Sequence, residues 1–311
     1  MRIKILVLPI ILALLWGCKK DAAAPVPAMY FPPVSSTEWE TMEPEQAGLN
    51  KAKLPELYAF LNQTNTNAFI LLKNGRIVLE HYNGNNLSGG NFTASSNWYW
   101  ASAGKTLTAF LIGKAQEEMY LSINDRTSKY LGSGWSSLTP AQENNITIRH
   151  QLSMSTGLDD GIPDNHCTTK NCFTFKAEPG TRWAYHNGPY TILDGVLEKA
   201  TNQSFDNYFN TRLRNKIGMD GFWTYLGADH VYFSTARAMA KYGLLILNKG
   251  KWADEVILQD KTYFEQMTNS SQSINPAYGY LWWLNGKTPL CCQVYSSRSM
   301  ATCRRLHLQI L

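Results

Sequence analysis

The stretch Trp98-Tyr-Trp-Ala-Ser-Ala-Gly-Lys105 sets a serine and a lysine three positions apart, just before an amphipathic segment. Apolar residues at helical spacing predict a helix from Ser102 to about Tyr120. In its first turn, residues i and i+3 share a face, so the Lys105 amine can reach the Ser102 hydroxyl and take its proton. The positive helix end favours an oxyanion and lowers the lysine pKa. Taken alone, the pair is better explained by an N-cap serine and a solvated lysine in the first helical turn.

A second candidate constellation is Tyr185-His186-Asn187. A phenol can relay a proton between nucleophile and leaving group, and an amide can hold a substrate carbonyl or the lysine. The same spacing recurs at Tyr208-Phe209-Asn210, in a predicted helix where we expect the tyrosine to pack rather than react. His186 is an alternative triad base. Because it is flanked by Tyr185 and Asn187, we expect it to point away from their face.

Outward from these motifs, the periodicity predicts a helix, a hairpin and a mostly helical middle. Asn50 can cap the first helix, and Asn74-Gly75 is a strong hairpin signal between strands 68–72 and 76–82. Further helices are predicted over residues 147–156, 190–200, 204–217 and 235–247, and strand character returns only at 278–284. This order predicts an α+β fold, an α/β sandwich with an antiparallel sheet flanked by helices and an all-helical insertion.

The N-terminus has the three parts of a secretory signal. Arg2 and Lys4 precede a 12-residue apolar run, Ile5 to Trp16, which is too short to span a bilayer as a helix. Cys18 follows Leu-Trp-Gly17 and resembles a bacterial lipobox cysteine. We therefore predict a signal peptide over 1–17, lipidation of Cys18 and a tether over 18–36, with plain secretion as the alternative.

Composition and charge exclude several classes of protein. A chain with 44% apolar and 17% charged residues can bury a sizeable core. Removal of residues 1–17 lowers Lys+Arg from 29 to 27 against 24 acids, and a net charge of about +3 is too weak for a nucleic-acid partner.

A polar loop contains Cys167 and Cys172, and in an oxidising compartment a local disulfide is expected there. His166 beside them raises the alternative of a metal site. Two sulfurs and one imidazole lack a fourth ligand, so no metal is expected.

Six segments together resemble the serine beta-lactamase-like family. It includes class C beta-lactamases, D-alanyl-D-alanine peptidases, related esterases and 6-aminohexanoate-dimer hydrolases. The segments, in family order, are Trp100-Ala-Ser-Ala-Gly-Lys-Thr106, Ile146-Thr-Ile-Arg-His-Gln-Leu-Ser-Met-Ser-Thr-Gly-Leu158, Glu178-Pro-Gly through Tyr185-His-Asn187, Ile217-Gly-Met219, Ser234-Thr-Ala-Arg237 and Tyr278-Gly-Tyr-Leu-Trp-Trp283. The resemblance implies a beta-lactamase/transpeptidase-like domain over residues 37–286, with a helical subdomain at about 120–250.

The resemblance also implies a role for each matching residue. Ser102 is expected to be the nucleophile, and its backbone amide one half of the oxyanion hole. Lys105 is expected to accept the proton and Tyr185 to relay it. Asn187 is expected to orient the substrate. No cofactor is implied.

The family's third motif, a triplet on a C-terminal strand, has no counterpart here. Lys287-Thr288-Pro289 mimics it, but Pro289 lacks the backbone amide that the motif's glycine provides. Three of the six cysteines fall between Cys291 and Cys303. We interpret residues 287–311 as an atypical tail, truncated or read in a shifted frame, on a chain that lacks the usual C-terminal strands. A divergent ending is the alternative.

These observations predict an exported serine hydrolase, lipid-anchored in the bacterial envelope, in the periplasm or on the outer surface. It would cleave a small-molecule ester, amide or peptide through an acyl-enzyme on Ser102. The first alternative is a beta-lactamase or a peptidoglycan D-alanyl-D-alanine peptidase. The second, favoured by the missing third motif, is a catalytically incomplete envelope lipoprotein. No G-x-S-x-G, H-E-x-x-H or P-loop supports a different enzyme class.

Overall fold

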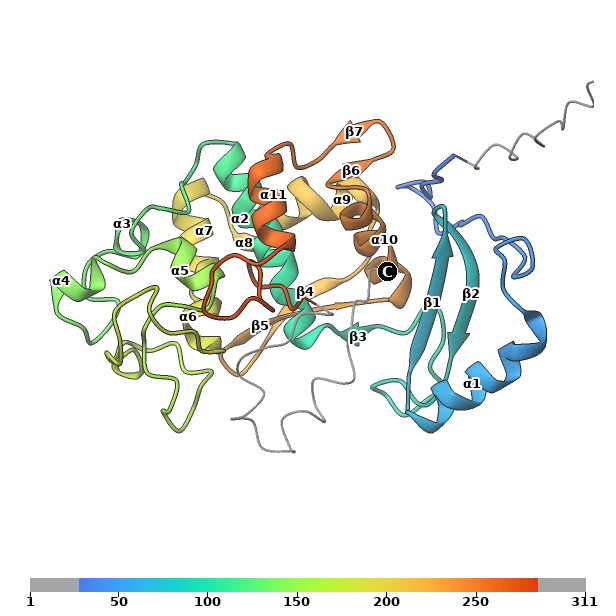
Figure 1. Cartoon of the computed structure of the whole chain (residues 1–311), viewed down its shortest axis with the longest axis horizontal. Helices are drawn as coiled ribbons and strands as arrows, with labels where there is room; N and C mark the ends of the chain where they lie inside the picture. The colour runs from blue at the N-terminus through green and yellow to red at the C-terminus, as the bar shows by residue number, and fades with distance from the viewer. Residues whose placement is uncertain (1–27, 285–311) are drawn as a thin grey trace, which may run out of the picture.

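The computed structural model describes residues 28–284, in which short antiparallel strands alternate with helices (Figure 1). The strands are β1 (Ala68–Lys73), β2 (Arg76–Tyr82), β3 (Trp98–Tyr99), β4 (Phe222–Leu226), β5 (Asp229–Ser234), β6 (Lys251–Trp252) and β7 (Glu255–Val256). The helices are α1 (Leu54–Gln63), α2 (Lys105–Glu117), α3 (Ser128–Leu131), α4 (Pro140–Glu143), α5 (Ile148–Leu152), α6 (Asn187–Thr191), α7 (Leu193–Thr201), α8 (Phe205–Phe209), α9 (Asn215–Ile217), α10 (Ala236–Leu247) and α11 (Lys261–Thr268). The predicted signal peptide, Cys18 and residues 287–311 lie outside the described residues.

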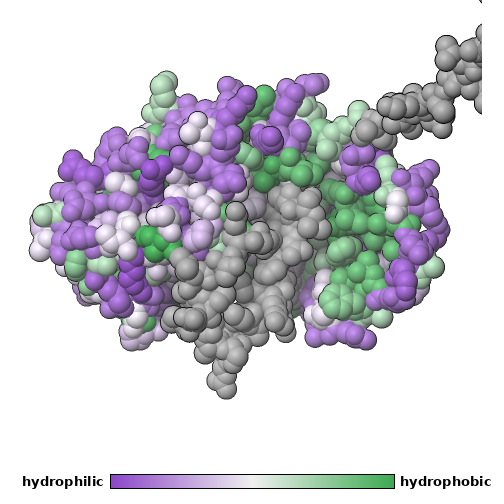
Figure 2. Space-filling view, in the orientation of Figure 1, coloured by the Kyte–Doolittle hydropathy of each residue, from purple (hydrophilic) through white to green (hydrophobic). Residues whose placement is uncertain are grey.

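The predicted hairpin is confirmed, and helices α1 and α10 pack against it. Asn74 and Gly75 have φ angles of 48° and 79°, which is the left-handed geometry that a two-residue hairpin turn requires. Helix α1 packs on one face through Leu54 and Leu57, and α10 packs against β1 on the other side. Strand β1 is therefore apolar on both faces, and Figure 2 shows this apolar surface over the hairpin, on the right of the molecule.

A three-stranded antiparallel sheet has the order β3-β5-β4, and two of its strands, β4 and β5, lie inside the insertion that was predicted to be all helical. Its β4–β5 hairpin turns at Gly227, whose φ of 65° suits a residue without a Cβ. The prediction that strand character returns only near residue 278 was therefore wrong. β-branched and aromatic residues in this region, such as Val231 and Tyr232, favour strands.

The predicted strand at 278–284 is instead a loop with one isolated bridge between Tyr278 and Trp283. Its backbone turns sharply, since Leu281 has a φ of 59°. The Leu281 N–H donates to the Leu152 carbonyl at 2.9 Å, and no ladder partner continues the bridge within the described residues. Apolar alternation alone therefore misidentified this segment, because its hydrogen bonds go to a helix end.

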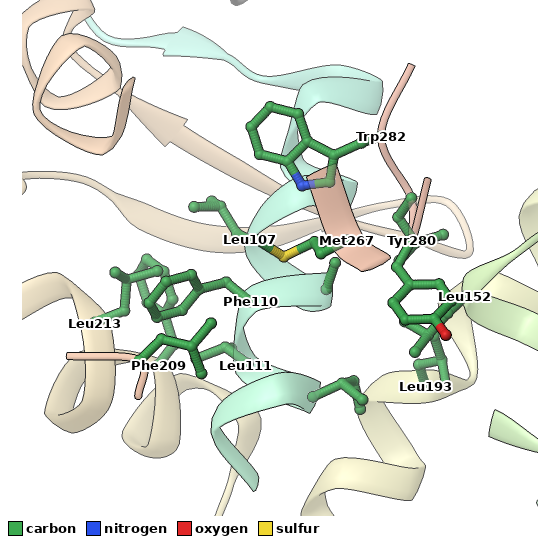
Figure 3. Packing of buried hydrophobic residues seen from close by; sticks show 14 of the residues in the cluster. Leu107, Phe110, Leu111, Leu152, Leu193, Phe209, Leu213, Met267, Tyr280 and Trp282 are labelled. Atoms are coloured by element: carbon green, nitrogen blue, oxygen red, sulfur yellow. The ribbon is translucent and has the colours of Figure 1, made fainter. Parts of the chain in front are cut away.

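Helix α2 forms the centre of the main core, between the helices α7 and α8 and the loop that carries Trp282 (Figure 3). Every residue from Lys105 to Gly113 is buried. Gly113 is required by packing, because a Cβ there would lie 2.2 Å from the Tyr263 ring. The Tyr263 hydroxyl donates to the Ala109 carbonyl at 2.6 Å, so α11 is tied to α2 by a buried hydrogen bond.

The other predicted helices form with different bounds. Helix α5 is shorter than residues 147–156 and begins after Thr147, which accepts from the His150 N–H. The predicted helix 204–217 is divided by a π-helical turn at Asn210–Arg214. Tyr208 is fully buried and donates to Glu118, which confirms that the second Tyr-x-Asn copy packs in a helix.

The Ser234-Thr-Ala-Arg237 segment ties α10 to the first hairpin. Thr235 caps α10, and Arg237 donates two hydrogen bonds to the Glu80 carboxylate, from Nε at 2.6 Å and from a terminal nitrogen at 2.7 Å. Burial works to raise the pKa of Glu80, but the hydrogen bonds from Arg237 and Tyr82 outweigh it and lower the pKa. This bidentate pair is a strong type of ion pair.

We expect Arg237→Met to lower the free energy of unfolding by about 1–3 kcal/mol, because it leaves a half-buried Glu80 carboxylate without its partner. Urea unfolding measures the difference. Lys216→Met is the matched control, since Lys216 pairs with Glu255 in a largely exposed bridge that should contribute less than about 0.5 kcal/mol. Equal losses in the two variants would contradict the structural role given to Arg237.

Candidate active site

Trp100, two residues before Ser102, is held by hydrogen bonds from both its backbone and its side chain. The Trp100 N–H donates to the Tyr232 carbonyl at 2.8 Å, and its indole N–H donates to the Ser234 hydroxyl at 2.7 Å. Both partners belong to β5, and Trp100 is almost completely buried. The three-stranded sheet therefore fixes where the chain enters the turn that carries Ser102.

Ala101 and Ser102 begin a 3-10 turn, Ala101–Gly104, that leads directly into α2. Ala101 has a φ of 45°, a left-handed conformation that is strained for a residue with a side chain. This bend leaves Ser102 exposed at the start of a buried helix, while Lys105 is only 5% exposed. The Lys105 Nζ lies 3.4 Å from the Ser102 Oγ, at hydrogen-bond distance.

The Tyr185 ring lies beside the Lys105 amine. The Lys105 Nζ is 5.3 Å from the centroid of the Tyr185 ring and 4.3 Å from that of Tyr190. Tyr185 also stacks on the Trp283 indole, with 5.7 Å between ring centroids and 40% of Trp283 exposed. The structure thus brings three predicted site residues together and adds two aromatic rings beside them.

Tyr190 was missed by sequence reasoning, although its position three residues after Asn187 in a predicted helical region places it near the Tyr185 motif. Burial raises its pKa far above that of a free phenol, so Tyr190 stays protonated. One helical turn later, burial raises the pKa of Asp194 to about 6 despite a hydrogen bond with His230. This buried acidic group lies behind the site rather than in it.

Asn187 is buried, with 7% exposure, and its amide faces a neighbouring loop. Its Nδ2 donates to Asn165 Oδ1 at 2.8 Å and lies 3.2 Å from His166 Nε2. Its Oδ1 has no hydrogen-bond partner among the described residues. Asn165 and His166 belong to a polar loop without periodicity, so no sequence signal identified them as neighbours of the site.

His186 stands between Tyr185 and Asn187 in the sequence. Its side chain is buried and faces the protein interior, where its ring centroid lies 6.4 Å from that of Phe173. Neither ring nitrogen has a hydrogen-bond partner in the described residues. Burial lowers the pKa of His186 to about 4, so the ring is neutral at physiological pH. An imidazole without a hydrogen bond to Ser102 lacks the geometry of a triad base.

The loop beside Asn187 is closed by a disulfide between Cys167 and Cys172, with 6.0 Å between their Cα atoms. His166 Nδ1 lies 2.6 Å from a carboxylate oxygen of Asp229 rather than turning to the sulfurs. Among residues 28–284, no group of three or more His, Cys, Asp or Glu side chains is arranged to hold a metal ion. The mimic of the third motif at Lys287 lies outside this range.

The beta-lactamase family model matches residues 60–296, which is most of the chain. The chain belongs to the beta-lactamase family. The fold of this family member is therefore the beta-lactamase/transpeptidase-like α+β fold, as predicted, and is a fold of serine hydrolases. A comparison with curated protein sequences finds no match.

Solved structures share this fold at low sequence identity. A penicillin-binding protein homologue from Pyrococcus abyssi is 19% identical, with a TM-score of 0.59 over 75% of this chain and 64% of that one. The chain thus spans less than two thirds of that relative. A Bacillus anthracis protein described as a 6-aminohexanoate-dimer hydrolase is 18% identical, with a TM-score of 0.64 over 83% of this chain and 76% of that one.

A third similar structure is EstCE1, described as a hydrolase with promiscuous acyltransferase activity. It is 16% identical, with a TM-score of 0.57 over 74% of this chain and 82% of that one.

We expect His186→Phe to flatten the dependence of stability on acid. An unfolded histidine has a pKa of about 6.5, so the unfolded chain binds a proton more readily than the folded chain between pH 6.5 and about 4. His186 should contribute a fall of about 3 kcal/mol to the wild-type free energy of unfolding across this window, and the variant should lack that contribution. Urea unfolding at pH 7 and pH 4.5 measures it.

Asp194 acts in the opposite sense, because its raised pKa makes the folded chain the stronger proton binder between about pH 3.8 and 6. Asp194 is present in both the wild type and His186→Phe. The difference between their losses of unfolding free energy at acid pH therefore reports His186. An equal acid loss in the variant would contradict the assignment. A loss of hydrolysis greater than about tenfold in His186→Phe would restore the triad alternative.

Proposed function

We propose that this protein is a serine hydrolase that forms an acyl-enzyme on Ser102. The observation that carries the proposal is the contact between an exposed serine hydroxyl and a buried lysine amine at 3.4 Å. Burial disfavours the charged form of an amine, and the neutral amine is the form that can accept a proton. Tyr185, next to the same amine, supports the role of a proton relay.

In the first half-reaction, Ser102 Oγ attacks the substrate carbonyl carbon and its proton passes to the neutral Lys105 amine. The Ser102 backbone N–H is proposed to donate to the developing oxyanion. The tetrahedral intermediate then breaks its bond to the leaving group. That alcohol or amine leaves with the proton, which reaches it from Lys105 through the Tyr185 hydroxyl.

In the second half-reaction, water attacks the acyl carbon of the ester on Ser102. Lys105 and Tyr185 take the proton from this water and return it to the Ser102 oxygen as the acid leaves. Asn187 is proposed to orient the substrate through its amide group. The family's second oxyanion donor belongs to the third motif, for which this sequence has no recognised counterpart, so no second donor is assigned.

The preferred substrate is proposed to be an ester or a short amide with an apolar acyl group. Trp283, stacked on Tyr185 and 40% exposed, offers a flat apolar surface next to the proposed relay. The Bacillus anthracis protein described as a 6-aminohexanoate-dimer hydrolase and EstCE1, described as a hydrolase, have the same fold. This agreement supports the choice without setting the substrate.

We also propose that the protein is exported and anchored by a lipid on Cys18. None of the helices among residues 28–284 has the length and hydropathy needed to cross a bilayer. Cell fractionation of the full chain should find it with membranes, and Cys18→Ala should move it to the soluble fraction, because one thioether-linked lipid group is lost. The same partition for both proteins would contradict the anchor.

Fluorophosphonate treatment should add one adduct to the wild-type protein, and Ser102→Ala should abolish it, because only an activated serine reacts readily. Tyr185→Phe should lower ester turnover about 10²- to 10⁴-fold, since it removes the proposed proton relay. Intact mass and initial rates measure the two effects.

The matched control is Tyr208→Phe in the second Tyr-x-Asn copy, which should keep turnover within about threefold, because Tyr208 contacts Glu118 in the core. An adduct that persists in Ser102→Ala would assign the nucleophile elsewhere. A folded wild-type protein without an adduct would favour the catalytically incomplete lipoprotein.

A p-nitrophenyl ester should be hydrolysed with a kcat/KM at least about tenfold higher than that for nitrocefin, because a partly exposed apolar ring, Trp283, lies beside the relay. Initial rates of the same preparation give the ratio. A ratio below one would rank the beta-lactamase alternative first.

A further inference from the structure

Asn165 binds the segment that carries Tyr185 and Asn187 through four hydrogen bonds. Its Oδ1 accepts from the Asn187 backbone N–H at 3.0 Å and from the Asn187 Nδ2 at 2.8 Å. Its Nδ2 donates to the Tyr185 carbonyl at 3.3 Å, and its own carbonyl accepts from the Gly188 N–H at 3.0 Å. A single side chain from a separate loop thus fixes the backbone of two proposed site residues.

These hydrogen bonds also decide which way the Asn187 amide is turned. Because one Asn165 side-chain atom accepts a backbone N–H, that atom is the oxygen, and the Asn187 atom that faces it is the nitrogen. His166 Nε2, 3.2 Å from the same nitrogen, is the acceptor if His166 keeps its proton on Nδ1 toward Asp229. The buried Asn187 Oδ1 has no hydrogen-bond partner among residues 28–284.

The loop that carries Asn165 and His166 is closed on itself and pressed against the site. Cys167 and Cys172 form a disulfide, and the Cys167 carbonyl lies so near Gly188 that a Cβ there would be 2.3 Å from it. On its other side, His166 reaches Asp229 at 2.6 Å. Asn165 lies two residues before Cys167, where the loop closed by the disulfide begins. This covalent ring therefore limits how far Asn165 can move from the Tyr185 segment.

We propose that Asn165 is a positioning residue for Asn187 and Tyr185, and that the Cys167–Cys172 disulfide holds it in place. The role in turnover rests on the proposed hydrolase function, whereas the positioning itself does not. The Asn165 acceptor sets the direction of the Asn187 amide, and the Tyr185 carbonyl bond sets the start of the motif. Loss of either the acceptor or the covalent ring would loosen the site without removing a reacting group.

Amide hydrogen exchange on the full chain tests the positioning without any need for activity. Exchange in a peptide that spans residues 185–190 should be at least about threefold faster in Asn165→Ala and in the Cys167→Ser/Cys172→Ser double variant. Asn165→Asp, which keeps an acceptor for Asn187, should fall between Asn165→Ala and wild type. Asn171→Ala is the matched control, because Asn171 is an exposed asparagine in the same ring.

Ester hydrolysis by the same proteins tests the consequence. Asn165→Ala should lower kcat about 10- to 100-fold with KM within about threefold, and the double cysteine variant should lower it in the same direction. Unchanged exchange in both variants would overturn the proposal. Faster exchange in Asn165→Ala but not in the double cysteine variant would show that the disulfide has no part in the positioning. Faster exchange with an unchanged kcat would show that the positioning does not affect catalysis. A wild-type protein without turnover would defeat the hydrolase function, while exchange would still decide the positioning.

Discussion

The burial of helix α2 on all sides is the constraint on which the rest of the structure depends. Residues Lys105 to Gly113 are enclosed, so the helix has no solvent-facing side in its first two turns. Tyr242 and Tyr263 each donate a hydrogen bond to a carbonyl of this helix, at 2.8 Å and 2.6 Å. Because these hydroxyls would be unsatisfied if the helix shifted, α2 is held in both translation and rotation.

This rigid helix explains how residues distant in sequence can meet at one amine. Lys105 sits in the first turn of α2, so its position follows from the core rather than from a surface loop. Tyr185 reaches this amine from a loop segment, and Trp283, in the last described part of the chain, stacks on Tyr185. One side of the site is therefore formed by a rigid helix and the other sides by loops. This arrangement is expected where a rigid scaffold positions the reacting groups and the loops determine which substrate binds.

Local patterns predicted the parts of this fold that local chemistry decides. The Asn74-Gly75 turn, the Asn50 cap of the turn that leads into α1 and the three-residue spacing of Ser102 and Lys105 depend on neighbours in sequence. These features could therefore be predicted from the sequence, as could the family motifs.

Long-range hydrogen bonds decided the parts that were missed. The segment near Tyr278 alternates like a strand, but its backbone bonds go to α5 and to a single bridge. The role of Asn165 depends on a contact with Asn187, 22 residues away, that leaves no periodicity in either segment. Conversely, β4 and β5 pair with each other inside the insertion that was expected to be all helical, between the helices predicted over 204–217 and 235–247. Strand formation there depends on this pairing rather than on local spacing alone.

At Ala101, which has a left-handed conformation, a substitution that favours stability would be expected to disfavour reactivity. An alanine with a φ of 45° costs about 1–2 kcal/mol relative to an ordinary conformation, and glycine would relieve that cost. Glycine would also give the chain before Ser102 new freedom. A library selected for heat resistance and one selected for turnover should therefore diverge at this position, because the methyl group that lowers resistance to heat is also the one that restricts the nucleophile.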